Sequence, residues 1–449
     1  MGSFHTKEIV RLFSALSLLF WMNAANAQNP ITAPGVYIAD PSAHVWKDGK
    51  LYVYGSLDVS PNFYCSNSYH VLSTSDLKNW TLTKNSFASA GAQDAVPYSD
   101  DFLYAPDVHY KKDTYYLYYC LANRTSTEGV AVSESPLGPF KDAKIVATKG
   151  INQIDPCVFM DDDGQAYYIW GQFTAKMAKL KPNILEIDSA TIRENIVTEK
   201  EHRFHEGGYM VKRKGIYYFV YSGLSVKDMP TCISYATSRS PWGPFKYGGV
   251  IVNNDGCDPG NWNNHGSLVE FKNQWYVFYH RATHNSKTMR KACVEKIQFT
   301  KDGRIPEVEM TSQGAGEPLE AKAVIEAERA CLLNGSVNIQ LLTEHVEGLT
   351  ELKNGDRVAY KYIDFGSGVD SVTFRVLPGK SSVKIRVMTD ALWSANGYLG
   401  TIEIPSQNEQ KEFVELKVPV KSVKGIHAVW LSFTSMNPEG FKLDWFKFE

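Results

Sequence analysis

Short runs in which apolar and polar residues alternate recur along the first two thirds of the chain. In residues 154–171 an Asp-Pro pair is followed by apolar residues, an Asp-Asp-Asp-Gly turn and the alternating run Tyr-Tyr-Ile-Trp. Alternation with a period of two on either side of an Asp/Gly turn is typical of a half-buried β-hairpin. Pro156 is compatible with this prediction, because the first residue of a strand need not donate a hydrogen bond to the sheet.

The hairpin pattern occurs five times, and one polar residue stands at the same position of each repeat. These residues are Asp40, Asp107, Asp155, Glu206 and His265, separated by 67, 48, 51 and 59 positions. Repeats of about 40–50 residues that each form a four-stranded sheet are typical of β-propellers. We therefore predict a five-bladed β-propeller over residues 28–312. No long amphipathic helix is predicted, which argues against an α/β barrel.

The pattern changes after residue 312. Residues 313–322 are mostly small, polar or glycine, as expected of a linker. Residues 323–449 contain alternating runs, such as 371–376 and 428–433, separated by Gly, Asn and Pro turns. This length and spacing are typical of a β-sandwich. The complete prediction is an all-β chain with a five-bladed propeller followed by a jelly-roll sandwich.

Composition narrows the possible partners. The chain has 47 Lys and Arg against 49 Asp and Glu, a formal net charge of −2, so it lacks the basic excess that nucleic acids or anionic membranes attract. Aromatic residues make up 13% of the 449 residues, which suits both β-structure and sugar-stacking surfaces. Beyond the N-terminus no stretch is apolar and long enough to span a bilayer. No feature of the sequence defines an oligomeric state.

The N-terminus has the pattern of a secretory signal. Lys7 and Arg11 precede an apolar run over 12–22, and residues 25–27 (Ala-Asn-Ala) place small side chains where signal peptidase cleaves. We predict a signal peptide over residues 1–27 and export to the periplasm or the extracellular space. The first six residues also fit an N-myristoylation pattern, but the apolar run and the cleavage site favour export.

Seven cysteines are scattered along the chain without Cys-x-x-Cys spacing. This distribution is not that of a metal cluster or a redox motif. The number is odd, and a chain of this length needs no disulfides to stabilise its core. We therefore expect mostly free, buried thiols.

The repeated polar position suggests chemistry at the propeller axis. The first strand of each blade begins at the central channel, so equivalent residues of different blades converge there. Two carboxyl groups about 6.5–9.5 Å apart can hydrolyse a glycosidic bond with inversion, and a third beside the acid helps to keep it protonated. The alternative is that these Asp-Pro and Glu-Gly pairs only form strand-entry turns. The pattern alone leaves both interpretations open.

Three segments resemble the signature regions of glycoside hydrolase family 43, a family of five-bladed, inverting enzymes. They are residues 39–41 (Ala-Asp-Pro), 154–164 (Ile-Asp-Pro through Asp-Asp-Asp-Gly) and 205–207 (His-Glu-Gly). The resemblance extends over about residues 32–310. It implies that Asp40 is the general base and Glu206 the general acid, with Asp155 as the pKa modulator that also orients the acid. No organic cofactor is implied.

The same resemblance implies further site residues. His265 would bind a metal ion in the channel, for which Ca²⁺ is the candidate, and a hydrogen-bonded structural histidine is the alternative. Arg281 would bind sugar hydroxyls, and a surface ion pair is the alternative. Tyr104, Asp107 and Trp170 are candidates to line the pocket, unless they only pack between blades.

The C-terminal segment resembles carbohydrate-binding module family 6. The resemblance rests on residues 325–328 (Ile-Glu-Ala-Glu), 362–366 (Tyr-Ile-Asp-Phe-Gly) and 443–448 (Leu-Asp-Trp-Phe-Lys-Phe). It implies that Glu326, Glu328 and Asp444 are ligands of a structural Ca²⁺, since hard cations prefer oxygen ligands. Residues 355–357 (Gly-Asp-Arg) and 406–410 are polar where the family commonly has stacking aromatics. Trp393 and Tyr398 could substitute, and a packing role without sugar binding is the alternative.

These observations lead to three hypotheses about function. The first is a secreted, inverting glycoside hydrolase that releases α-L-arabinofuranose or β-D-xylose from plant polysaccharides. Arabinofuranosidase activity is favoured, and β-xylosidase, endo-xylanase and galactofuranosidase activities are the alternatives. The second is a propeller that binds carbohydrate without catalysis. The third is a lectin-like assembly through the C-terminal sandwich. Residues 61–67 lie in the longest interval between repeats and are a candidate wall of the site.

Overall fold

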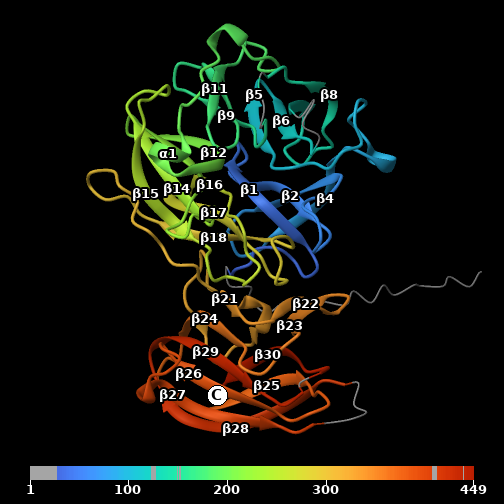
Figure 1. The fold of residues 1–449 in the computed structure, drawn as a ribbon, viewed down its shortest axis with the longest axis vertical. Coiled ribbons are helices and arrows are strands. Elements are labelled where there is room, and N and C mark those ends of the chain that lie inside the picture. The colour runs from blue at the N-terminus through green and yellow to red at the C-terminus, as the bar shows by residue number, and fades with distance from the viewer. Residues whose placement is uncertain (1–27, 123–127, 149, 151–152, 407–411, 438) are drawn as a thin grey trace, which may run out of the picture.

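The computed structural model describes residues 28–122, 128–148, 150, 153–406, 412–437 and 439–449. It consists almost entirely of β-strands, which form two domains, one above the other in Figure 1. The prediction of an all-β fold is therefore confirmed. The predicted signal peptide and the alternative myristoylation pattern lie outside the described residues.

The first three blades are antiparallel sheets formed by consecutive strands. Blade 1 contains β1 (Tyr37–Val45), β2 (Leu51–Asp58), β3 (Ser68–Thr74) and β4 (Thr81–Ala88). Blade 2 contains β5 (Asp107–Lys111), β6 (Thr114–Cys120), β7 (Glu128–Ser133) and β8 (Lys141–Ile145). Blade 3 contains β9 (Cys157–Met160), β10 (Ala166–Trp170) and β11 (Lys176–Lys179).

Two further blades complete the upper domain. Blade 4 contains β12 (Phe204–Arg213), β13 (Ile216–Gly223), β14 (Cys232–Ser238) and β15 (Lys246–Asn253). Blade 5 contains β16 (Ser267–Phe271), β17 (Gln274–Arg281) and β18 (Lys291–Ile297). The described helices are single turns: η1 (Gly91–Gln93), η2 (Ser189–Thr191) and α1 (Glu199–His202) here, and η3 (Ala327–Arg329) and η4 (Ala395–Gly397) in the lower domain.

The first strands of the blades close into a ring. Strand β1 contacts β5, β5 contacts β9, β9 contacts β12, β12 contacts β16, and β16 returns to β1. The segment before β1 strengthens the closure, because the backbone N–H of Ile31 donates to the carbonyl of Ala292 in β18 at 2.9 Å. The five sheets therefore form the predicted five-bladed propeller.

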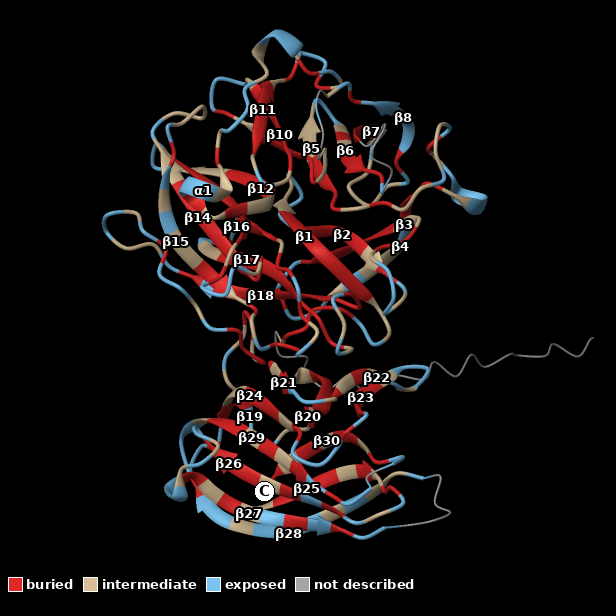
Figure 2. Cartoon of the chain, in the orientation of Figure 1, coloured by how far each residue is buried: buried red, intermediate tan, exposed pale blue. Residues whose placement is uncertain are grey.

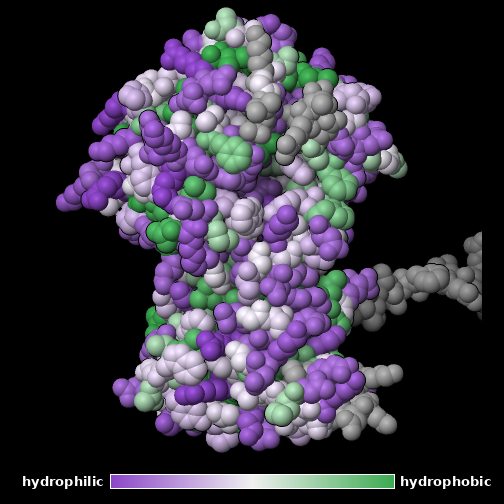
Figure 3. All heavy atoms as spheres, viewed as in Figure 1, coloured by the Kyte–Doolittle hydropathy of each residue, from purple (hydrophilic) through white to green (hydrophobic). Residues whose placement is uncertain are grey.

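Burial decreases toward the outermost strand in blades 1, 2 and 4 (Figure 2). Strand β1 is buried over its first seven residues, whereas β8 is largely exposed and β4 and β15 are only partly buried. This gradient explains why the first hairpin of each repeat was the segment recognisable in the sequence. Figure 3 shows that the visible surface of both domains is mainly hydrophilic, with scattered apolar side chains.

The lower domain is a β-sandwich of two sheets. One sheet contains β19 (Leu319–Glu320), β21 (Leu332–Asn334), β24 (Arg357–Asp364), β26 (Val383–Thr389), β27 (Tyr398–Ile404) and β29 (Ile426–Thr434). The other contains β20 (Ile325–Glu326), β22 (Asn338–Thr343), β23 (Val346–Thr350), β25 (Val369–Leu377), β28 (Val414–Val423) and β30 (Lys442–Phe448). Their facing side chains form one apolar core.

Part of the predicted linker belongs to the sandwich. Leu319 and Glu320 form β19, which pairs in parallel with β24. The preceding residues pack against the same strand, because the backbone N–H of Ser312 donates to the carbonyl of Lys361 at 2.6 Å. The connection is therefore a folded junction rather than a free tether.

All seven cysteines are free and buried, as predicted. In the described part of the chain, no helix has the length and apolar character needed to cross a membrane.

Candidate active site

One cavity of about 190 Å³ is lined by residues from all five blades. Its lining residues are Asp40, Tyr64, Cys65, Tyr104, Ala105, Ile154, Asp155, Gln172, His205, Glu206, Trp262, Asn263, His265 and Arg290. The structure thus brings together four of the five repeated polar residues. Tyr64 and Cys65 belong to the segment 61–67 that was expected to form a wall. Tyr104 also lines the cavity.

Irregular backbone directs the three acidic side chains into this cavity. The β1–β2 register shifts between Ala39 and Ser42, and the β12–β13 register shifts on both sides of Glu206. Such bulges change the direction of a side chain at the end of a strand. Asp40 and Asp155 also have positive φ angles of 51° and 58°, a conformation that aspartate tolerates better than most residues.

Gly207 allows Glu206 to approach the axis. Its φ angle is +65°, and a Cβ atom at this position would lie 2.8 Å from Nε2 of His265. Any larger residue would push His265 away from the carboxyl groups. Packing against His265 therefore explains the glycine of the His-Glu-Gly segment, in addition to the chemistry of Glu206.

Asp40 is held as a carboxylate. Its Oδ1 lies 2.8 Å from an Arg290 guanidinium nitrogen, and its Oδ2 accepts a hydrogen bond of 2.6 Å from the Ser56 hydroxyl. Burial alone would raise the pKa of Asp40, but the charge of Arg290 and the contact with His280 lower it below the usual value. Asp58 fixes Arg290 in turn, because it accepts two hydrogen bonds of 2.9 and 3.0 Å from the guanidinium.

Asp155 is in the opposite electrostatic situation. It is buried, and its backbone N–H donates to Sγ of Cys120 at 3.3 Å. Burial first, and then the negative charges of Glu206 and Asp40, raise its pKa well above the ordinary value. A carboxyl group in this position holds its proton more strongly than an exposed aspartate does.

Glu206 is oriented by two amide side chains. Its Oε2 accepts a hydrogen bond of 2.9 Å from Gln172, and its Oε1 accepts one of 3.3 Å from Asn263. His205 Nε2 lies 3.9 Å from Oε2. The two amides come from different blades, so the position of Glu206 depends on the closed propeller.

His265 lies between two of the carboxyl groups. Its Nδ1 is 3.7 Å from Oδ1 of Asp40 and 3.9 Å from Oδ2 of Asp155. Burial lowers its pKa, although the charges of Asp40 and Glu206 oppose this. No cluster of three or more His, Cys, Asp or Glu side chains within the described ranges has the arrangement of a metal site. An ion held by His265 alone would not need such a cluster, so the channel ion stays a prediction, and no step below uses one.

Three predicted pocket residues lie outside the cavity. Asp107 is buried between blades, where its carboxylate accepts hydrogen bonds from the Ser42 hydroxyl (2.6 Å) and the Val158 N–H (2.8 Å). Trp170 is 1% exposed and packs in the apolar core between blades 2 and 3. Asp107 and Trp170 therefore pack between blades, which was the alternative to their lining the pocket. The third residue, Arg281, requires a separate correction.

Arg281 is at the base of blade 5 and not in the cavity. Its Nε donates to Sγ of Cys293 at 3.0 Å, and its charge acts on Cys331 of the sandwich. Arg290, which was not among the predicted site residues, lines the cavity beside Asp40 instead. The two arginines flank one hairpin turn, and the hydrophobic pattern does not show which of them faces the axis.

Sequence reasoning also missed the neutral residues of the cavity. Gln172 and Asn263 lie in loops, where no periodicity marks them. Trp262 is 48% exposed and lines the cavity from the loop before β16. A large exposed aromatic side chain next to carboxyl groups is the usual composition of a sugar site. The Asn-Trp-Asn-Asn-His run at 261–265 was the one available signal.

The three acids predicted to bind calcium in the sandwich line one cavity of about 340 Å³. Oε2 of Glu328 and Oδ1 of Asp444 are buried without hydrogen-bond partners, and burial raises the pKa of Glu328 to about 7. Arg375 forms an ion pair with Asp444 there. The oxygen donors have the chemistry of a calcium site, but these acids, like the other described ones, do not converge as metal ligands.

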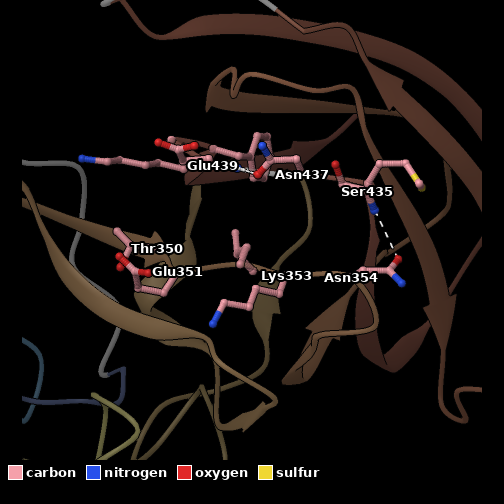
Figure 4. Close-up of a pocket in the computed structure, with 12 residues that line it drawn as sticks. Thr350, Glu351, Lys353, Asn354, Ser435, Asn437 and Glu439 are labelled. Atoms are coloured by element: carbon pink, nitrogen blue, oxygen red, sulfur yellow. Dashed lines mark hydrogen bonds between the residues drawn. The ribbon is translucent and has the colours of Figure 1, made fainter.

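A larger cavity of about 550 Å³ opens at one end of the sandwich (Figure 4). Residues 350–354 face residues 435–437 and 439–442 across it, and the Ser435 N–H donates to Oδ1 of Asn354 at 3.3 Å. Phe441 is the one aromatic residue in its lining. Trp393 and Tyr398, the predicted substitutes for stacking residues, do not line it. Arg357 instead lies 5.1 Å above the ring of Trp393.

Comparison with known families agrees with this geometry. Residues 27–305 match the model of the glycosyl hydrolases family 43, and residues 326–449 match the carbohydrate binding module family 6. The first match covers more than half of the chain. The protein belongs to glycosyl hydrolase family 43 and is a glycoside hydrolase with a C-terminal module of family 6.

Several relatives match this chain over most of its length. A xylosidase/arabinosidase of Thermoclostridium stercorarium is 30% identical, over 92% of this chain and 97% of the relative. An arabinoxylan arabinofuranohydrolase of Bacillus subtilis is 30% identical, over 91% and 90%. A crystal structure of a Bacillus subtilis arabinoxylan arabinofuranohydrolase with cellotetraose has a TM-score of 0.54 at 26% identity, covering 94% of this chain and 97% of that one.

A fourth relative matches the propeller part. CoXyl43, a β-xylosidase/α-arabinofuranosidase from a compost metagenome, was solved with xylotriose in a calcium-free form. It has a TM-score of 0.54 at 29% identity, covering 64% of this chain and 98% of that one.

Proposed function

We propose that the protein is an inverting glycoside hydrolase that releases α-L-arabinofuranose or β-D-xylose from plant polysaccharides. The observation that carries this proposal is the convergence of Asp40, Asp155 and Glu206, from three blades, on one cavity with opposite shifts of pKa at the two aspartates. The names of the relatives from Thermoclostridium stercorarium and Bacillus subtilis support the two sugars. Among the alternatives, arabinofuranosidase activity remains favoured.

Asp40 has the properties of a general base. It is ionised at neutral pH, and both of its oxygens are fixed by hydrogen bonds to Arg290 and Ser56. A carboxylate held in this way can orient a water molecule and accept its proton as the water attacks the anomeric carbon. Inversion follows when this water approaches from the face opposite the leaving group.

Glu206 has the properties of the general acid. The amides of Gln172 and Asn263 orient its carboxyl group within the cavity. Beside it, burial and the charge of Glu206 raise the pKa of Asp155 well above its ordinary value. We therefore assign to Glu206 the transfer of a proton to the leaving oxygen, and to Asp155 the task of modulating the pKa of this acid and orienting it.

The shape of the cavity favours removal of one terminal sugar. About 190 Å³ is below the range of about 300–1,000 Å³ typical of pockets for drug-sized ligands. The wall formed by residues 61–67 is tied to blade 5, because the Ser286 hydroxyl donates to the Pro61 carbonyl at 2.7 Å. The exposed ring of Trp262 offers a surface for stacking the next sugar.

Two conservative variants test the assigned roles. Asp40→Asn and Glu206→Gln keep the size of each side chain but remove the base or the acid. We expect each to lower kcat by about 10²- to 10⁴-fold on an aryl α-L-arabinofuranoside or β-D-xyloside, the usual contribution of general acid–base catalysis. An aryl galactofuranoside completes the panel. Unfolding curves like those of the wild type show that the fold is intact, and retained turnover in either variant would remove its assigned role.

We also propose that the protein is exported. The N-terminal pattern of residues 1–27 supports this, and its action on a polymer outside the cell agrees with it. Export with cleavage before Gln28 gives a mature chain whose N-terminal sequence begins Gln-Asn-Pro-Ile.

A further inference from the structure

A buried ion pair joins the propeller to the sandwich. Nζ of Lys291, the first residue of β18, lies 2.7 Å from Oε2 of Glu347 in strand β23, and both side chains are 1% exposed. Oε1 of Glu347 accepts hydrogen bonds from the Gly35 N–H (2.9 Å) and the Tyr37 hydroxyl (3.2 Å). Buried charges are tolerated when they are paired and hydrogen-bonded, and Glu347 satisfies both conditions.

The partners of Glu347 adjoin the proposed base. Lys291 directly follows Arg290, whose guanidinium is 2.8 Å from Asp40. Tyr37 begins β1, three residues before Asp40. One carboxylate of the sandwich therefore holds the starts of the two strands that position the base and its arginine.

Other contacts fix the sandwich in this place. The Ile339 N–H donates to the Thr283 carbonyl at 2.8 Å, and the Leu333 N–H donates to the Cys257 carbonyl at 3.0 Å. In Figure 1 the sandwich lies below β18, which agrees with these contacts. No lining residue of the cavity belongs to the sandwich, so any influence on catalysis must pass through the propeller strands.

We propose that Glu347 is a positioning residue for the active site. Glu347 binds both Lys291 at the start of β18 and Tyr37 at the start of β1, and in this way it maintains the contact of Arg290 with Asp40. The C-terminal domain thus has a role in catalysis that does not depend on whether it binds sugar. This inference rests on the proposed role of Asp40 as the base.

The test uses the full-length variant Glu347→Gln. It keeps the shape of the side chain but removes the charge that Lys291 faces. We expect kcat to fall about tenfold while KM changes little, because a small displacement of a catalytic group lowers the rate without removing substrate contacts. We also expect the acid limb of the kcat/KM profile to move to higher pH by about half a unit, since a looser Arg290 contact favours protonation of the base.

Glu309→Gln is the matched control. Glu309 also pairs with a lysine of the sandwich, Lys361, at 3.0 Å, but its side chain is exposed and it is far along the chain from β1. This variant should leave kcat and the acid limb unchanged. A purely structural role of Glu347 predicts the same kinetics for both variants once the folded fractions are matched, and that result would overturn the proposal.

A double variant covers the case in which Glu347→Gln does not fold. Lys291→Met with Glu347→Leu replaces the pair by apolar side chains, a change that is often neutral for stability. It should still lower kcat and shift the acid limb, and an unshifted profile at wild-type kcat would refute the inference. Asp40→Asn in the same assay separates the proposed role of Asp40 from that of Glu347. An active Asp40→Asn variant would show that Asp40 is not the base. An inactive Asp40→Asn variant together with unchanged kinetics of the Glu347 variants would refute only the role of Glu347.

Discussion

At the scale of single residues, the site depends on how differently two aspartates are surrounded. Asp40 faces Arg290 and is kept ionised, whereas Asp155 is buried beside other acids and tends to keep a proton. Both follow the same Asp-Pro pattern and both have positive φ angles. Their chemical difference therefore comes from neighbours in other blades and not from local sequence.

Arg290→Met tests the origin of the ionised base. The variant should move the acid limb of kcat/KM to higher pH, because Asp40 loses the charge that lowers its pKa. It should also lower kcat/KM by about 10²-fold through misplacement of the base. Unfolding should become easier by about 3–5 kcal/mol, since Asp40 and Asp58 remain buried without their partner.

Arg281→Met is the comparison for this variant. Arg281 is equally buried but lies at the domain junction, so its loss should lower stability without moving the acid limb. Equal shifts of the limb in both variants would show that Arg290 has no specific action on Asp40. Kinetics are measured well below the unfolding temperature of each protein.

The same pair shows the limit of sequence reasoning at this scale. Repeat position predicted that Asp40, Asp155, Glu206 and His265 lie together, and they do, but it also predicted this of Asp107, which lies outside the cavity. It could not decide which of Arg281 and Arg290 faces the cavity. The direction of each side chain depends on how far the alternation of the strands continues on either side of the turn between them. Gln172 and Asn263 lie in loops and could not be found from periodicity.

At the scale of elements, the ring of first strands places the acids, and the N-terminal segment completes blade 5. Asn29 is fully buried, and its side chain donates to the carbonyls of Val294 and Thr311 (both 3.1 Å) and accepts from the Val294 N–H at 2.9 Å. Alternation predicted the hairpins well, because the inner strands are half-buried or buried. It did not predict this segment, whose contacts are distant in sequence.

Asn29→Ala should destabilise the propeller by about 1–3 kcal/mol. The substitution leaves the Val294 N–H and several acceptors buried without partners, and each such group carries a desolvation penalty of this order. Denaturant unfolding of both proteins measures the difference. Asn253→Ala, whose side chain accepts one local hydrogen bond from the Asp255 N–H, is the milder control. An equally small effect of both substitutions would mean that the segment does not close the ring.

At the scale of the whole molecule, the sandwich is part of one folded unit with the propeller. Sequence pattern predicted two domains joined by a linker, but part of that linker forms β19 and a packed junction. Interdomain contacts such as the ion pair between Lys291 and Glu347 join residues that are distant in sequence and belong to no common motif. The sequence pattern therefore could not predict them. The structure also places a cavity at the end of the sandwich whose lining includes Phe441 but neither Trp393 nor Tyr398.

The stereochemistry of the first product tests the central claim most directly. ¹H NMR during hydrolysis of an aryl α-L-arabinofuranoside or β-D-xyloside by the wild-type protein distinguishes the anomer released from the one formed later by mutarotation. A water activated by Asp40 and a proton delivered by Glu206 predict that the inverted anomer appears first. Initial release of the sugar with retained configuration would contradict the account.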